Sequence, residues 1–118
     1  MGQKSDFRKI AKISAKVIEE KKGGDILILD VRKISDFTDY LVIASGTSDT
    51  HIRTLFNELD ENLPISAYKK EMKNRPHWAV LDYGGVVIHI FHADTRKFYN
   101  LENNWATAKK VNFKQKKT

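Results

Sequence analysis

Apolar residues recur at helical spacing near the start of the chain. Within residues 5–21 they form one stripe together with the small polar Ser14: Phe7, Ile10, Ala11, Ser14, Val17 and Ile18. Charged residues fill the positions between them. This spacing of three and four residues predicts an amphipathic helix, and Gly23 and Gly24 are expected to end it.

Two short, nearly unbroken apolar runs follow, "DILILDV" (25–31) and "YLVIAS" (40–45). Runs of this kind are typical of strands that are covered on both faces. The polar link between them, "RKISDFTD" (32–39), is short enough to join neighbouring strands.

A second helix is expected after Gly46, where Thr47 or Ser48 can accept a backbone N–H as the N-cap. Its apolar stripe consists of Ile52, Leu55, Phe56, Leu59 and Leu63, and Pro64 follows its end. The chain then predicts a strand at about 65–70, so that strand, helix and strand form a crossover of the βαβ type.

The stretch "HWAVLDYGGVVIHIFH" (77–92) reads as strand, Gly-Gly turn and strand. Beyond it, Asp94 is expected to cap a short helical turn, and the spacing of Leu101, Trp105 and Ala108 predicts a last helix. Together these elements predict one α/β domain with a mixed sheet of about five strands flanked by helices. The domain is expected over residues 1–108, with a basic tail at 109–118.

The chain of 118 residues is basic, with a net charge of +6, and has no cysteine. Disulfides, zinc-thiolate sites and thiol nucleophiles are therefore excluded. Five lysines without an acidic residue lie in the last ten positions, and a second basic cluster consists of Lys69, Lys70, Lys73 and Arg75. These clusters suit either a solvated surface or an acidic partner such as nucleic acid. No apolar run approaches the roughly 18 residues that span a bilayer, so no membrane contact is expected. The start of the chain has no secretion signal, which favours a cytoplasmic protein.

Metal and nucleophile chemistry find little support in the sequence. His89 and His92, three positions apart on one strand, point to opposite faces, and two histidines without a carboxylate make a poor metal site. "SGTSD" is not the nucleophile elbow of hydrolases, and His51 is expected to be solvated. The Gly46-Thr47-Ser48 loop resembles the opening of nucleotidyltransferases, but no strand carries the paired carboxylates that those enzymes need. We expect no metal, no cofactor and no catalytic residue.

The hairpin divides into two faces. A two-residue Gly84-Gly85 loop, expected as a type I′ turn, places Trp78 opposite Phe91 and Asp82 diagonal to His89. Diagonal neighbours lie about 7–8 Å apart at Cα, within reach of a polar contact. One face is ordinary core: Ala79, Leu81, Tyr83, Val86, Ile88 and Ile90. The other, here called the hairpin face, consists of Trp78, Val80, Asp82, Val87, His89 and Phe91. Its aromatic and polar residues suit an interface centre or a layer covered by a helix equally well.

With these motifs in place, the chain resembles the ribosomal silencing factors, the Iojap or YbeB-like proteins. The likeness rests on four ordered stretches: "DILILDV", "SDFTDYLVIASGTSDTHIR", "WAVLDYGGVVIHIF" and "RKFYNLENNW". The resemblance implies a nucleotidyltransferase-like fold without the catalytic carboxylates, and a protein that is not an enzyme. Such factors bind the large ribosomal subunit at large-subunit ribosomal protein fourteen and sterically prevent joining of the small subunit. They thereby silence translation when nutrients are short and assist subunit maturation.

The resemblance also implies a partner-binding surface that extends the hairpin face toward the C-terminus. Its expected members are Trp78, Asp82, His89, Phe91, Arg96, Tyr99, Leu101, Glu102 and Trp105. Trp78, Phe91 and Tyr99 would be apolar anchors, whereas Asp82, His89, Arg96 and Glu102 would supply polar or charged contacts. Trp105, at helical spacing with Leu101, is more often a core residue than an interface residue. The basic clusters would add contact with ribosomal RNA, and a homodimer is a further expectation because members of the family often crystallise as dimers.

Two other functions remain open on the sequence. One is a small nucleotidyltransferase-like enzyme that uses the Gly46-Thr47-Ser48 loop, which should bind nucleotide and Mg²⁺. The other is a non-specific RNA-binding module, whose binding should fall steeply with salt and should not depend on Trp78.

Overall fold

The computed structural model describes residues 6–99, 103 and 105–113 of the chain. Its elements follow the order α1 (Phe7–Glu20), β1 (Gly24–Asp30), β2 (Tyr40–Gly46), α2 (Asp49–Asn62), β3 (Lys69–Met72), β4 (Trp78–Asp82), β5 (Val86–His92), α3 (Ala93–Tyr99) and β6 (Lys109–Lys110). No helix within these described ranges has the length and apolar character that crossing a bilayer requires.

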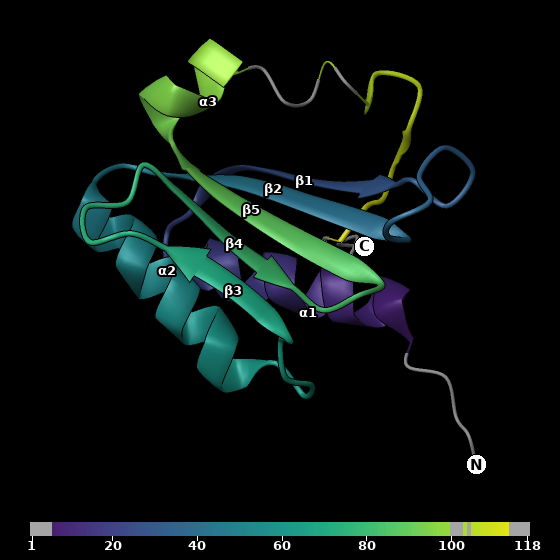
Figure 1. The fold of residues 1–118 in the computed structure, drawn as a ribbon, viewed down its shortest axis with the longest axis horizontal. Coiled ribbons are helices and arrows are strands. Elements are labelled where there is room, and N and C mark those ends of the chain that lie inside the picture. Colours follow the sequence, from purple (N-terminus) through teal and green to yellow (C-terminus); the bar gives the residue numbers. More distant parts are fainter. Residues whose placement is uncertain (1–5, 100–102, 104, 114–118) are drawn as a thin grey trace, which may run out of the picture.

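The strands form one mixed sheet in the order β3-β4-β5-β2-β1-β6. Strands β2 and β5 are parallel, whereas β1 pairs antiparallel with β2 and β4 antiparallel with β5. The β2-α2-β3 crossover is confirmed, but its last strand covers Lys69–Met72 instead of about 65–70, and it lies three positions from β2, at the sheet edge. Helices α1 and α2 lie side by side against one face of the sheet, and α3 lies on the opposite side (Figure 1).

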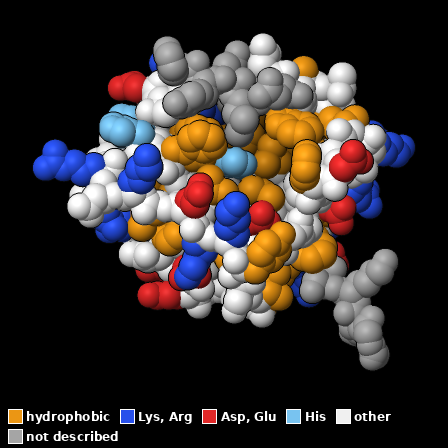
Figure 2. Space-filling view, in the orientation of Figure 1, with side chains coloured by type: hydrophobic (Ala, Val, Ile, Leu, Met, Phe, Trp, Pro, Cys, Tyr) orange, Lys and Arg blue, Asp and Glu red, His pale blue; other side chains and the backbone are white. Residues whose placement is uncertain are grey.

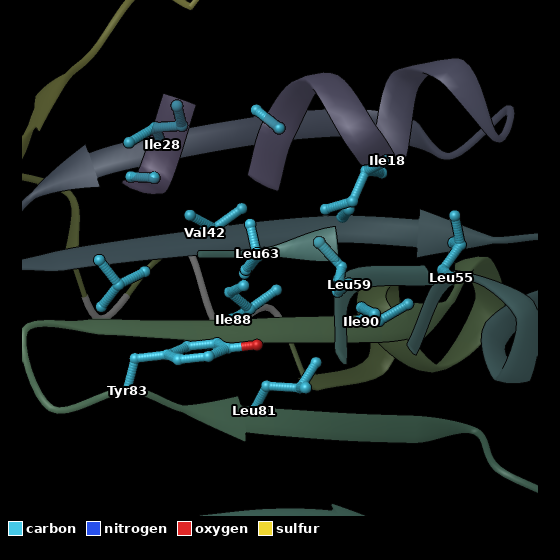
Figure 3. Packing of buried hydrophobic residues seen from close by; sticks show 14 of the residues in the cluster. Ile18, Ile28, Val42, Leu55, Leu59, Leu63, Leu81, Tyr83, Ile88 and Ile90 are labelled. Carbon is cyan, nitrogen blue, oxygen red and sulfur yellow. The ribbon is translucent and has the colours of Figure 1, made fainter. Parts of the chain in front are cut away.

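The main core lies between the sheet and the helices α1 and α2. Side chains from both helices meet those of β1, β2, β4 and β5 in one cluster, as Figure 3 shows. All five residues of the predicted α2 stripe are buried: Ile52, Leu55, Phe56, Leu59 and Leu63. The core face of the hairpin is buried as predicted, from Ala79 through Ile90. Removal of this apolar surface from water is the main stabilising contribution to such a fold.

Local sequence signals set the ends of both long helices. The Asp6 carboxylate accepts a hydrogen bond from the backbone N–H of Lys9 at 3.1 Å and caps α1. The Ser48 hydroxyl accepts the N–H of His51 at 3.0 Å and caps α2. After α1 the left-handed residue is Lys22, with φ 71°. Gly23 is required instead by close packing, because a Cβ there would lie 2.2 Å from Cγ2 of Ile18.

The sequence prediction for the C-terminal part was wrong in two respects. The expected last helix over residues 101–108 is not formed in its described part, where residue 103 and Trp105 lie in short 3₁₀ turns and 106–108 in a turn and bend. The basic segment also does not begin as a solvated tail. Lys109 and Lys110 pair antiparallel with Asp30 and Leu29, and Val111 is buried in the main core. The sheet thereby gains a sixth strand.

The Tyr83 hydroxyl is buried in the main core. Among the described residues it is the one buried side-chain polar atom without a hydrogen-bond partner. Burial, with a smaller contribution from Asp60, raises the pKa of Tyr83 to about 12. The phenol therefore stays neutral at physiological pH, and the ring acts as an apolar filler of the core.

Candidate functional site: the hairpin face

The register of the hairpin is the predicted one. Trp78 pairs with Phe91, Val80 with His89, and Asp82 with Val87. Gly84 alone of the two turn glycines has a positive φ, at 87°. A type I′ turn needs positive φ at both central residues, whereas type II′ needs it only at the first. The expected type I′ turn was therefore wrong, but the loop length, and with it the register, is unchanged.

The hairpin face is only partly covered. A small second cluster continues it across the same side of the sheet onto β2 and β1: it consists of Leu29, Val31, Leu41, Ile43 and Phe91, and Val87, Trp105 and Ala108 pack against it. Trp78, at the other end of the face, is 40% exposed. Figure 2 shows hydrophobic side chains gathered around a histidine near the middle of this side of the molecule, with charged side chains bordering them.

Trp78 is held in place from two directions although it is exposed. Its Nε1–H donates a hydrogen bond to Nδ1 of His89 at 3.0 Å. Its ring stacks on Phe91, with centroids 5.0 Å apart and planes inclined at 22°. Phe91 is fully buried, so the indole lies on a rigid base. A large, exposed aromatic side chain whose rotamer is fixed loses little conformational entropy when it is buried by a partner.

His89 is neutral in this arrangement, because only an unprotonated Nδ1 can accept the Trp78 hydrogen bond. Burial lowers the pKa of His89 to about 4, and the negative charge of Asp82 opposes this effect only in part. A histidine that is neutral in the folded protein and can be protonated once unfolded makes stability depend on pH.

We expect the free energy of unfolding to fall as the pH decreases from about 6.5 toward 4. The folded pKa of His89 is about 4, against an ordinary value of 6.5. The unfolded chain therefore binds the additional proton first, and the contribution of His89 is fully present only above pH 6.5. Between pH 7 and pH 5 the loss should be about 2 kcal/mol. Urea unfolding of wild type and His89→Gln checks this, since glutamine offers an acceptor that does not titrate. Equal pH dependence in the two proteins would contradict it.

Asp82 does not form the expected polar contact with His89. One oxygen of its carboxylate accepts the backbone N–H of Gly84 at 2.8 Å and so supports the turn. The acceptor side of His89 is occupied by Trp78 instead. Trp78 and Asp82 both lie on positions diagonal to His89, but the Asp82 carboxylate is held at the turn by the Gly84 N–H, whereas the indole reaches Nδ1 of His89.

The remaining members of the expected site lie in different surroundings. Arg96 is buried on α3 and donates a hydrogen bond from Nη1 to the Ser45 hydroxyl at 2.8 Å. It therefore links α3 to the end of β2 rather than facing solvent. Trp105 is half-buried against the second cluster. Leu101 and Glu102 lie outside the described residues, as does the side chain of Tyr99.

The backbone of the Gly46-Thr47-Ser48 loop is hydrogen-bonded to the side chain of His51, a role that the sequence did not indicate. His51 was expected to be solvated, but its Nδ1 accepts the backbone N–H of Thr47 at 3.0 Å. Its Nε2 lies 2.9 Å from the carbonyl oxygen of Lys21, to which it donates. His51 thus ties the end of α1 to the start of α2, and it uses an N–H that a bound phosphate would need.

The histidines at the ends of the hairpin are paired with each other. The rings of His77 and His92 meet edge to face with centroids 5.7 Å apart, and the His92 N–H donates to the His77 carbonyl at 2.7 Å. Within the part of the chain that the structure describes, no group of three or more His, Cys, Asp or Glu residues could hold a metal ion.

Comparison with known proteins gives one consistent result. A family model described as "Ribosomal silencing factor during starvation" (RsfS) matches residues 4–118. The ribosomal silencing factor RsfS of Bacillus subtilis is 40% identical over 112 residues, covering 92% of this chain and 91% of its own. A mouse protein named "Mitochondrial assembly of ribosomal large subunit protein 1" is 30% identical over 100 residues, covering 75% of this chain and 42% of its own.

A solved structure has the same fold. The crystal structure of protein CV0518 from Chromobacterium violaceum superposes with a TM-score of 0.83 at 25% sequence identity, and the match covers 95% of each chain. The family match spans nearly the whole chain, including the hairpin and the β6 segment. The chain therefore belongs to the RsfS family of ribosomal silencing factors, which also includes the Iojap proteins.

Proposed function

We propose that this protein silences ribosomes by docking its hairpin face on a protein of the large subunit, which we take to be large-subunit ribosomal protein fourteen on the joining surface. The observation that carries the proposal is Trp78, exposed at 40% yet fixed by His89 and Phe91. Energetically dominant interface residues are typically such aromatic anchors near the centre of a patch. The name of the mouse relative, which refers to assembly of the large subunit, supports that subunit as the partner.

The members of the hairpin face have separate tasks in this proposal. Trp78 enters a pocket on the partner, and the half-buried Val80 and Val87 extend the apolar contact around it. Phe91 and His89 act from beneath, since they hold the indole. Asp82, half-buried at the turn end, offers its second carboxylate oxygen to a donor of a basic partner.

Silencing in this proposal requires exclusion only, and no catalysis. The chain measures 40 × 37 × 30 Å along its principal axes, so a bound copy fills the space that the small subunit needs. A standard interface of roughly 1,600 Å² in total is enough to hold it there.

The test is sedimentation of the purified protein with separated ribosomal subunits at near-physiological salt. We expect it to sediment with the large subunit, not with the small one, and to lower the fraction of joined ribosomes when both are present. Equal binding to both subunits that disappears with added salt would instead favour a non-specific RNA-binding module.

A further inference from the structure

We propose that a hollow at the sheet edge, next to the hairpin face, binds the phosphate backbone of ribosomal RNA while the hairpin face binds protein. This inference rests on the proposed function, because ribosomal RNA lies beside the groove only if the hairpin face is bound to the large subunit. The hollow, here called the edge groove, has a volume of ≈ 740 Å³ and is formed by β3, the 73–77 loop and the start of β4. Trp78 and Val80 belong to both its wall and the hairpin face, so the two surfaces are continuous.

Two of the cations at the edge groove form no ion pair within the described part of the chain. Among the described residues, the ion pairs join Lys21 to Glu58, Arg32 to Asp30 and Lys70 to Asp60. Lys73 and Arg75, which are exposed and line the groove, take part in none of them. Glu71 is the one carboxylate in the lining, so the groove is positive overall.

The loop that carries these cations is anchored at three points. Arg53 on α2 donates a hydrogen bond from Nη2 to the carbonyl of Asn74. Pro76 is buried, and the His77 carbonyl accepts the N–H of His92 at 2.7 Å. Cations on a loop that is already fixed need little further ordering to contact a ligand.

The chemistry of the lining favours RNA over an acidic protein segment. A guanidinium and an ammonium that line the same groove suit neighbouring phosphates, which arginine can bind in a bidentate manner. The rings of His77 and Trp78 and the side chain of Met72 add flat or apolar surface beside them, against which a ribose or an unpaired base can pack. A chain with a net charge of +6 is also attracted to RNA at long range.

The experiment measures binding to large subunits as a function of salt. We compare wild type with Lys73→Gln/Arg75→Gln and with the matched control Arg8→Gln/Lys16→Gln, which removes the same charge from exposed positions on α1. Each lost phosphate contact should reduce the slope of log K against log salt by about 1. We therefore expect the groove variant to show a slope smaller by about 2 and at least tenfold weaker binding at low salt. The control should retain the wild-type slope.

A second measurement uses a single-stranded RNA of twelve mixed nucleotides and fluorescence anisotropy. The groove variant should bind it several-fold more weakly than wild type, and the control as wild type does. Equal losses in both variants would overturn the proposal, because charge alone would then explain binding. A groove variant that loses subunits but keeps the RNA would also overturn it, in favour of an acidic protein segment. If wild type ignores large subunits, the docking function fails, and the RNA measurement still decides on the groove.

Discussion

Replacing Trp78 with alanine should weaken binding to the large subunit by about 30-fold or more, which corresponds to the 2 kcal/mol that defines a hot-spot residue. The substitution removes the exposed indole, which the proposed function places in a pocket on the partner. It also leaves His89 and Phe91 without the ring that covers them. The protein itself should remain folded, since Trp78 is 40% exposed and lies outside both core clusters.

Two further variants make this result specific. Tyr68→Ala removes another exposed aromatic side chain, at 75% exposure, near Gly84 at the far end of the hairpin, and should bind as wild type does. Trp78→Phe keeps a ring on Phe91 but loses the hydrogen bond to His89, so we expect an intermediate affinity. Binding is measured by co-sedimentation over a range of protein concentrations, with circular dichroism of each variant. A folded Trp78→Ala protein with unchanged affinity would rule out the hairpin face as the dock.

Phe91→Ala should act on stability instead, and lower the free energy of unfolding by about 3–5 kcal/mol. The side chain is fully buried in the second cluster and contacts both Trp78 and His89 by ring stacking. Its removal opens a cavity between β2, β5 and the segment that carries Trp105. From the sequence, Phe91 was expected to contact the partner itself, but its side chain has no exposed surface. Its remaining role is indirect, through its ring contacts with Trp78 and His89.

The matched control is Phe37→Ala, the same change at a side chain that is 90% exposed. This variant should differ from wild type by less than about 0.5 kcal/mol. Urea unfolding followed by intrinsic fluorescence measures both variants. A Phe91→Ala protein that is as stable as wild type but no longer binds large subunits would show that Phe91 contacts the partner directly.

Local patterns in the sequence were sufficient to predict the hairpin and both long helices. Strict alternation and a two-residue glycine loop leave one register that keeps Ala79, Leu81 and Ile88 on one side. The Ser48 cap and the stripe beginning at Ile52 are likewise short-range signals. The type of the Gly-Gly turn was not predictable, because both primed turns accept glycine and preserve the register.

Errors arose where contacts between distant segments decide the outcome. The spacing of Leu101, Trp105 and Ala108 suggested a helix, but pairing of Lys109 and Lys110 with β1 takes this segment along the sheet. Lysines at an edge strand resemble a solvated tail in sequence, since their side chains point to water in both cases. His51 likewise shows no local sign of its bond to Lys21, thirty residues earlier in the chain.

The sequence by itself determined both long helices, the two faces of the hairpin and, through its ordered motifs, the family to which the chain belongs. Only the tertiary structure decided which residues of the hairpin face reach solvent. Trp78 is open while Phe91 is covered, because the order of strands places β4 toward a free edge and β5 beside β2 and α3. Alternation tells which side of a strand a residue is on, and long-range packing tells whether anything lies above it.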